Sequence, residues 1–179
     1  MTILFYILIV IASLVILFLV VAAFTGKKMI IEKTTTINKP LQEVFDYIRY
    51  LKNHQNFNVW TMIDPNMKKE FKGMDGQVGF VYGWDSATNK NVGAGEQEIK
   101  SIVEGKSIEH ELRFFRPMQN VAIATFQLEP ASAGQTRVMW GFYGDMKFPM
   151  NAMKSMFQNM LGKQLDTSLQ NLKNVMENS

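Results

Sequence analysis

The chain begins with a long uninterrupted apolar run, residues 2–24, which contains no charged residue, no glycine and no proline. At about 1.5 Å of rise per residue, this run forms a helix of roughly 35 Å, enough to cross a hydrocarbon core of about 30 Å. A cleaved signal peptide is the alternative, with Ala22 and Ala23 near a possible cleavage site. Against it, no Lys or Arg precedes the run, which is longer than the about 7–15 residues of a signal core. We therefore expect a retained transmembrane anchor over residues 1–26 and one further domain over residues 27–179.

After the anchor, two segments show the spacing of a helix with one buried face. Residues 41–51 carry apolar side chains three or four positions apart, and a second stripe continues for about seven turns near the C-terminus. A short polar segment with Phe57 and Trp60 is interpreted as an irregular helix between them. Gly162 lies inside the C-terminal stripe, where glycine costs up to about 1 kcal/mol relative to alanine, so we expect close packing or a bend there. The stripe begins near Pro149 and consists of Met150, Met153, Phe157, Met160, Leu161, Leu165, Leu169, Leu172 and Met176.

The stretch from residue 76 to residue 144 alternates between apolar and polar positions, as half-buried strands do. Connectors with Gly, Pro, Asn and Ser divide it into five strands, which predicts an antiparallel meander with one apolar face. A strand over residues 29–38 precedes the first helix. The predicted fold class is α+β, in which the long C-terminal helix covers the apolar face of the sheet. The alternation directs the following side chains towards that helix: Val78, Phe80, Tyr82, Trp84, Gln97, Ile99, His110, Leu112, Phe114, Phe126 and Trp140.

Charge and composition exclude several classes of function. The 19 basic and 16 acidic side chains all follow the anchor, and the lysines do not form the concentrated basic face that a nucleic-acid site requires. We therefore expect no nucleic-acid partner. Lys27, Lys28 and Lys33 follow the anchor directly, which predicts a single-pass protein of the cell membrane with its domain on the cytoplasmic side. With no cysteine and two histidines, the chain is expected to bind no metal and no other cofactor.

The chain also carries a series of short motifs in a fixed order: Ile37-Asn38-Lys39-Pro40 with Val44-Phe45, then Trp60, Gly79 to Trp84, Gly93-x-Gly95, Leu112-x-Phe114-x-x-Pro117, Phe126-x-Leu128-Glu129-Pro130 and Thr136-x-Val138-x-Trp140. In this order they resemble the SRPBCC superfamily with the START-like helix-grip fold, and within it the polyketide cyclase/dehydrase and lipid-transport branch. The resemblance covers residues 29–176. It implies a curved antiparallel sheet wrapped around the long helix, with an apolar cavity that binds lipids, hormones, quinones or polyketides. It transfers no catalytic residue.

His110 is the main candidate for chemistry, because the alternation places it inward beside Leu112. An imidazole in an apolar cavity could orient a carbonyl or hydroxyl group of a ligand, or act as a general acid or base. The alternative is a buried histidine that bonds only to the backbone. The Gly93-Ala94-Gly95 run lacks the third glycine of a dinucleotide fingerprint, so it favours strand curvature over a phosphate site. The carboxylates on the opposite strand faces are expected to be solvated: Glu96, Glu98, Glu109 and Glu111.

These observations predict a membrane-anchored domain that binds or transports a hydrophobic small molecule, such as a lipid or quinone, between the sheet and the last helix. One alternative is a cyclase or dehydratase that uses His110, with Tyr82, for proton transfer. Another is a tethered interaction module with a filled interior. An open apolar cavity with His110 at its wall would favour the first two, and a filled core would favour the third. The expected ligand-binding residues are Phe80, Tyr82, Trp84, Gln97, His110, Leu112, Phe114, Phe126, Trp140, Met153 and Phe157.

Overall fold

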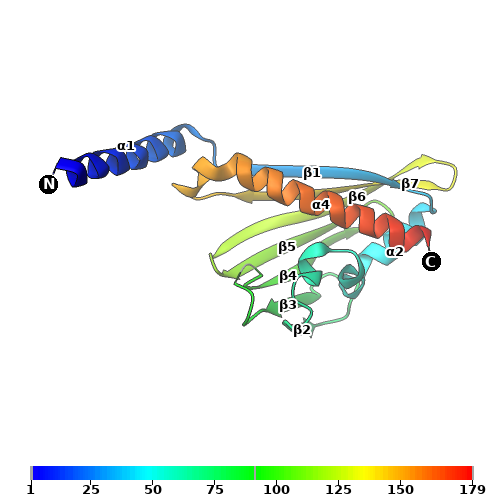
Figure 1. Ribbon diagram of the computed structural model, residues 1–179. Helices are drawn as coiled ribbons and strands as arrows, with labels where there is room; N and C mark the ends of the chain where they lie inside the picture. Colours follow the sequence, from blue (N-terminus) through cyan, green and yellow to red (C-terminus); the bar gives the residue numbers. More distant parts are fainter. Residues whose placement is uncertain (1, 91, 179) are drawn as a thin grey trace.

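The computed structural model describes residues 2–90 and 92–178 and shows an α+β helix-grip fold, in which a curved sheet wraps around one long C-terminal helix (Figure 1). The helix-grip architecture expected from the sequence is therefore confirmed. In chain order the elements are α1 (Thr2–Phe24), β1 (Lys28–Ile37), α2 (Leu41–Arg49), η1 (Leu51–Asn56), α3 (Val59–Met62), β2 (Lys68–Lys72), β3 (Val81–Asp85), β4 (Ala94–Val103), β5 (Ser107–Arg116), β6 (Asn120–Ser132), β7 (Gln135–Asp145), η2 (Met150–Met153) and α4 (Lys154–Glu177).

The seven strands form one antiparallel sheet in the order β1-β7-β6-β5-β4-β3-β2. Strands β2 to β7 are sequential neighbours because their connections are short turns, which can join only antiparallel strands. β1 closes the other edge by pairing with β7, so that Lys28 lies opposite Asp145 and Ile37 opposite Thr136. The first and last strands of the domain thus meet, and the beginning of β1 lies at the same end of the sheet as the end of β7.

The helix α4 packs along the inner face of the sheet, close to β1. Its second half supplies Leu165, Leu169 and Leu172, each of which is almost fully buried. Gly162 allows a close approach, since a Cβ atom at this position would lie 3.3 Å from Cε of Lys33. The close packing expected at this mid-helix glycine is therefore confirmed. Burial of a leucine contributes roughly 1.5–3 kcal/mol, so this stripe is a main source of stability for the grip.

Four details differ from the sequence prediction. Residues 76–80 are a turn and not part of a strand, since Gly76 and Gly79 have φ angles of 78° and 88°, and Val78 is consequently exposed. β2 is an additional edge strand that the alternation did not define. The last helix begins later than Pro149, because a short 3-10 turn, η2, precedes α4. Met160, expected in the buried stripe, is 46% exposed.

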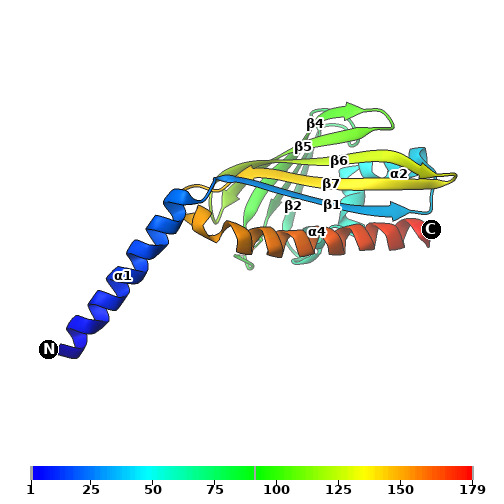
Figure 2. The same cartoon turned by 90° about the horizontal axis from the view of Figure 1, so that it is seen from above.

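The helix α1 is continuous over residues 2–24 and projects away from the domain in both views (Figures 1 and 2). Among its described side chains, Ala22 is buried and the others are largely exposed. By length and composition, α1 is a helix that could cross a membrane, a criterion that an N-terminal signal sequence also meets. The contact with the domain is confined to the last turn of α1.

Candidate functional site

The inward-facing side chains of the sheet lie as the alternation predicts. Phe80, Tyr82, Phe126 and Trp140 are each at most 5% exposed, and Gln97 is also buried. These residues come from β3, β4, β6 and β7 and from the turn before β3. The strand register inferred from the sequence is therefore confirmed.

The half of the interior farther from α1 is closed. Phe126 lies at its centre, with its ring centroid 4.5 Å from that of Trp140 and 6.5 Å from that of Phe57. Ile99 and Ile108 of the sheet are fully buried in the same region, opposite the leucines of α4. His110 is 0% exposed among these rings. The interior around His110 is therefore filled by side chains, and the open cavity expected at this position is replaced by packed aromatic rings.

The half nearer to α1 is more open along β5, β7 and the C-terminal helical segment, whereas the inward residues of β6 stay buried along the strand. Along β5, Ile108 and His110 are fully buried, whereas Leu112 and Phe114 are only half-buried. Along the last helix the order is mirrored, because Met153, Phe157 and Leu161 are half-buried and Leu165 is buried. On β7, Trp140 is buried and Phe142 is half-buried. We call this set the half-exposed inner face, and it comprises Trp84, Leu112, Phe114, Phe142, Met153, Phe157 and Leu161.

Small residues shape this half-exposed inner face. A Cβ atom at Gly95 would lie 2.6 Å from Cζ2 of Trp84, so the glycine allows the indole to lie flat on β4. The indole Nε1 donates a hydrogen bond to the carbonyl of Val92 at 3.3 Å. On β6 and β7, Ala122 and Gly144 lie opposite each other. On β6, the cross-strand neighbours of Leu112 and Phe142 are the small residues Ala122 and Ala124, whereas Gln97 and Ile31 lie on their other sides.

Two histidines lie where the closed half meets the half-exposed inner face. The ring of His54, from η1, lies 5.8 Å from that of His110, centroid to centroid, in an edge-to-face arrangement. Nε2 of His54 donates to the carbonyl of Ile48 at 2.8 Å, which assigns the proton of the neutral ring to this nitrogen. Among the described residues, Nδ1 of His54, both nitrogens of His110 and the hydroxyl of Tyr82 have no hydrogen-bond partner.

Burial controls the ionisation of the side chains of His54, His110 and Tyr82. It lowers the pKa of His54 from 6.5 to about 4, although the Ile48 carbonyl and Asp75 oppose the shift. Burial also lowers the pKa of His110 well below 6.5; His54 lowers it further, and the nearby Ala124 backbone opposes. The hydroxyl of Tyr82 has a pKa raised to about 12, again by burial. At neutral pH all three side chains are therefore uncharged, which suits contact with a neutral polar group.

His54 is the site residue that sequence reasoning missed. It lies in a short polar segment, and no periodic pattern indicates that its ring points inward. The one signal in the sequence is its position three residues before Phe57, an aromatic anchor of the same segment. The ring of Phe57 lies 4.9 Å from that of His54, so the anchor and the histidine enter the core together.

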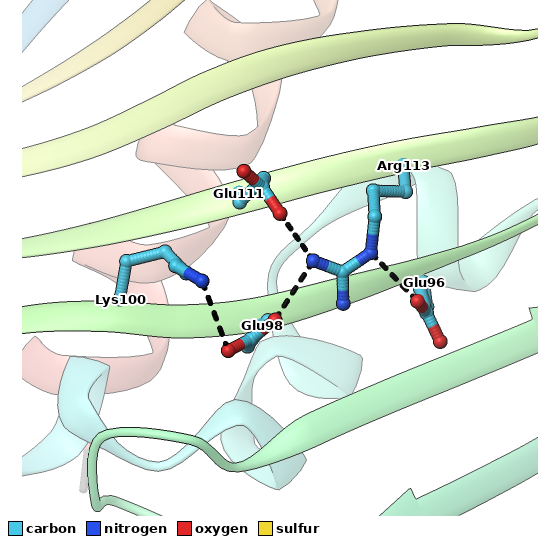
Figure 3. Close-up of polar contacts among 5 residues, drawn as sticks. All are labelled: Glu96, Glu98, Lys100, Glu111 and Arg113. Carbon is cyan, nitrogen blue, oxygen red and sulfur yellow. Dashed lines mark hydrogen bonds and ion pairs between the residues drawn. The ribbon is translucent and has the colours of Figure 1, made fainter.

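The outer face of the sheet carries a charged cluster centred on Arg113 (Figure 3). Its guanidinium contacts Glu96 at 2.6 Å, Glu98 at 2.7 Å and also Glu111. The hydrogen bond to Arg113 is the largest cause of the lowered pKa of Glu98. These three carboxylates lie on the outer face, as expected, but they are half-buried and paired with Arg113 instead of being freely solvated.

A groove of about 220 Å³ lies along β2, β3 and β4. Its lining mixes charged side chains with Trp84 and Phe115. The lining therefore lacks the continuous apolar character of a lipid site. Within residues 2–90 and 92–178, no group of three or more His, Asp or Glu side chains is arranged to hold a metal ion.

A curved antiparallel sheet that grips a long C-terminal helix, with an apolar inner face, defines the class of helix-grip proteins. The sequence profile of the family "Polyketide cyclase / dehydrase and lipid transport" matches residues 28–177. The chain belongs to this family. No curated protein sequence matches the chain at a significant level.

Solved structures with the same fold have low sequence identity to this chain. A truncated norcoclaurine synthase from Thalictrum flavum has a TM-score of 0.65 at 9% identity, covering 84% of this chain and 94% of that one. Protein MLL2253 from Mesorhizobium loti has a TM-score of 0.61 at 13% identity, with 84% and 98% covered. Protein CV1439 from Chromobacterium violaceum has a TM-score of 0.59 at 16% identity, with 83% and 98% covered. These similarities establish the fold.

Proposed function

We propose that the domain binds a hydrophobic small molecule, such as a lipid or a quinone, on the half-exposed inner face between the sheet and α4. The observation that carries this proposal is the gradient of burial along β5 and α4, which leaves Leu112, Phe114 and Phe157 half-exposed beside a closed core. Covering such apolar surface stabilises a complex by about 25 cal/mol per Å² before the costs of association.

The buried polar atoms next to this face suit a ligand with one polar group. His110 lies one inward position deeper than Leu112 on β5, and neither of its ring nitrogens has a partner among the described residues. Because both side chains are buried, a ligand carbonyl or hydroxyl group would reach His110 or Tyr82 only by displacing packed side chains, and it would then satisfy a polar atom that is costly to bury unpaired. An apolar chain with a carbonyl headgroup, as in a quinone or fatty acid, has this chemistry.

We assign α1 the role of a membrane anchor that holds this site beside the bilayer, where hydrophobic ligands are concentrated. The run of 23 uncharged residues in α1 and the basic pair Lys27-Lys28 behind it support this assignment. The same basic pair favours a domain on the cytoplasmic side. Protease treatment of sealed right-side-out vesicles should leave the domain intact, and digestion would overturn this orientation. A mature chain that begins near residue 24 would overturn the anchor.

The binding test uses the tryptophans, since the chain has three and α1 has none. Full-length protein in lipid nanodiscs would be titrated with decyl-ubiquinone and, separately, with a brominated fatty acid, both of which quench indole emission on contact. For the brominated fatty acid, we expect saturable quenching of the tryptophan emission, and we expect an excess of non-brominated fatty acid to reverse it. Quenching by both probes that only rises linearly, as simple partitioning into lipid would produce, would overturn the proposal.

A matched pair of variants localises the site. Leu112→Gln places a polar group on the half-exposed inner face, and Ile123→Gln makes the same type of change on the outward face of the adjacent strand β6. We expect Leu112→Gln to weaken the saturable quenching and Ile123→Gln to leave it unchanged. Equal effects of the two variants would place the ligand elsewhere.

An enzymatic function is the second candidate, and a specific feature favours it. One similar structure is named a synthase, so the fold can support catalysis in that protein. Here, the neutral imidazole of His110 and the hydroxyl of Tyr82 are both unpartnered and could exchange a proton with a bound substrate. The substitution His110→Phe separates the two functions.

A further inference from the structure

The connection between α1 and the domain is very short. α1 ends at Phe24 and β1 begins at Lys28, so residues 25–27 are all that separates them. Three residues span at most about 10 Å when fully extended. If α1 crosses a bilayer, the polar interfacial layer on each side is about 5–7 Å thick. The end of the sheet at which β1 begins must therefore lie at the surface of the membrane that holds α1.

Hydrogen bonds fix this connection further. Nδ2 of Asn151, a buried side chain of η2, donates to the carbonyls of Ala22 at 2.7 Å and Thr25 at 2.6 Å. Nζ of Lys154 donates to the carbonyl of Gly26 at 3.0 Å. These donors satisfy carbonyl groups at and just after the C-terminus of α1, which have no partner within a helix. The direction in which α1 leaves the domain is thus set by contacts as well as by chain length (Figure 2).

Two loops with exposed apolar tips lie at the same end of the domain (Figure 1). The end of β5 and the turn after it carry Phe115 and Met118, which are 49% and 57% exposed, and the loop after β7 carries Phe148, which is 52% exposed. The first loop is joined to the end of β7, and the second loop is joined to the chain leaving the anchor. Nδ2 of Asn120 donates to the carbonyl of Asp145, and the N–H of Met146 donates to the carbonyl of Lys27. We call Phe115–Met118 and Lys147–Phe148 together the anchor-side rim.

Basic side chains accompany these apolar tips. Lys27, Lys28 and Lys147 are exposed around the point where α1 meets the domain, and Arg116 lies between the apolar residues of its turn, where it also contacts Asp85. Aromatic or methionine side chains beside lysines and arginines suit the boundary between acyl chains and anionic headgroups. In water, the same tips would leave apolar surface exposed without compensation.

We propose that the anchor-side rim docks onto the bilayer that carries α1, with Phe115, Met118 and Phe148 inserted at the level of the headgroups. The half-exposed inner face opens towards this end of the domain, so a ligand would pass between membrane and site without crossing bulk water. The inference rests on the proposed role of α1 as an anchor. Since α1 keeps the rim at high effective concentration next to the lipid, a few weak contacts are enough to hold this orientation.

The test uses single cysteines, which the chain otherwise lacks. Full-length Met118→Cys and Phe148→Cys proteins would each carry a bimane label in vesicles of phosphatidylcholine and phosphatidylglycerol. Two reference positions complete the set. Ala133→Cys lies in the exposed turn between β6 and β7 at the opposite end of the sheet, and Ile11→Cys lies in the middle of α1. Lipids with a nitroxide at the headgroup or near the chain end would then quench the label according to depth.

We expect headgroup nitroxides to quench labels at Met118 and Phe148 several times more strongly than at Ala133, and chain-end nitroxides to quench the label at Ile11. Quenching at Ile11 with none at Met118 and Phe148 would overturn the docking and leave the anchor in place. The absence of quenching at Ile11 would overturn both the anchor and the docking that rests on it. Quenching at Ile11, Met118 and Phe148, together with failure of the tryptophan titration, would retain the docked rim and remove the ligand-binding function.

Insertion also has a functional consequence that a second pair of variants measures. Met118→Glu combined with Phe148→Glu should slow the transfer of brominated fatty acid from donor vesicles to the domain several-fold. Its equilibrium quenching should stay unchanged, because neither residue belongs to the half-exposed inner face. Ala133→Glu is the control. Equal transfer rates for the double variant and the control would overturn the proposed direct passage of the ligand from the membrane to the half-exposed inner face.

Discussion

The imidazole rings of His54 and His110 meet edge to face, 5.8 Å apart, where the filled part of the core adjoins the half-exposed inner face. The two residues are 56 positions apart in the sequence, and come from η1 and from β5. Both rings also contact Phe126, with centroid distances of 5.6 Å and 6.1 Å. A pair of neutral imidazoles held between apolar rings makes the stability of the fold sensitive to protonation.

The first prediction concerns this sensitivity. Because burial lowers the pKa of His54 to about 4 and that of His110 well below 6.5, the unfolded chain binds more protons than the folded protein below about pH 6.5. The histidine contribution is therefore constant above about pH 6.5 and becomes destabilising as the pH falls below it. The free energy of unfolding should drop by up to about 1.4 kcal/mol per pH unit for each histidine.

Urea unfolding between about pH 7.5 and about pH 5 measures this slope. A double variant, His54→Phe with His110→Phe, should show a much flatter dependence, because it removes both titrating groups. If the slope is the same in the double variant and in the natural sequence, other groups control the acid sensitivity.

A side chain's position could be predicted from the sequence where a regular repeat marks the buried face, and could not be predicted where no repeat exists. The inward position of His110 was predictable, because side chains in a strand alternate strictly between faces and Ile108 and Leu112 define the buried one. The position of His54 was not, since a short 3-10 segment has no long repeat that could reveal its buried side. The gradient of burial from Leu165 to Phe157 was also hidden, because both residues fit the same apolar stripe. Only the three-dimensional placement of α4 against the sheet distinguishes them.

A second limit concerns single contacts across the chain. The sequence indicated an anchor and a separate domain, but nothing in it indicated that Asn151 would reach back to α1. Asparagine is common in loops, and its partners here, Ala22 and Thr25, contribute only backbone carbonyl groups. Contacts to a backbone leave no trace in the residue type of the partner. Such contacts therefore become visible only in the structure.

The second prediction tests that contact. Asn151→Ala removes both hydrogen bonds to the end of α1, which should loosen the backbone of residues 25–27 and allow trypsin to cleave after Lys27 and Lys28. Loss of a buried hydrogen-bonding group costs about 1–3 kcal/mol, so local opening should become roughly 5–150-fold more frequent. Limited proteolysis in nanodiscs measures the cleavage rate. Asn159→Ala, an exposed asparagine of α4, is the control, and equal rates in the two variants would show that Asn151 does not hold the junction.

The third prediction concerns the close approach of α4 to β1. Gly162→Ala adds a methyl group 3.3 Å from Cε of Lys33, a flexible side chain that can move by a few tenths of an ångström. The gain in helix propensity, up to about 1 kcal/mol, should therefore offset the crowding and leave the stability nearly unchanged or slightly raised. Gly162→Leu also meets Ile31 on the sheet and should destabilise the fold by about 1–3 kcal/mol through overpacking. Thermal unfolding of both variants measures the difference, and equal stability would contradict close packing here.

The last prediction separates binding from catalysis through His110→Phe. Phenylalanine fills a similar space between Phe126 and His54 and removes two ring nitrogens that have no hydrogen-bond partner among the described residues. In a binding protein, the variant should keep or increase its affinity for a wholly apolar ligand, because an unpaired polar group is costly to bury. For a ligand whose carbonyl or hydroxyl contacts the imidazole, binding should weaken by about 1–3 kcal/mol. An enzyme that uses His110 as its general base would instead retain affinity and lose turnover by roughly 10²–10⁴-fold.

Titration of an alkane-chain probe, a quinone and a fatty acid, together with product analysis of each, distinguishes these outcomes. We expect the binding pattern, because His110 is neutral and enclosed by aromatic rings, whereas the half-buried Leu112 and Phe157 offer accessible apolar surface. Turnover that disappears in His110→Phe at unchanged affinity would replace the binding function with an enzymatic one.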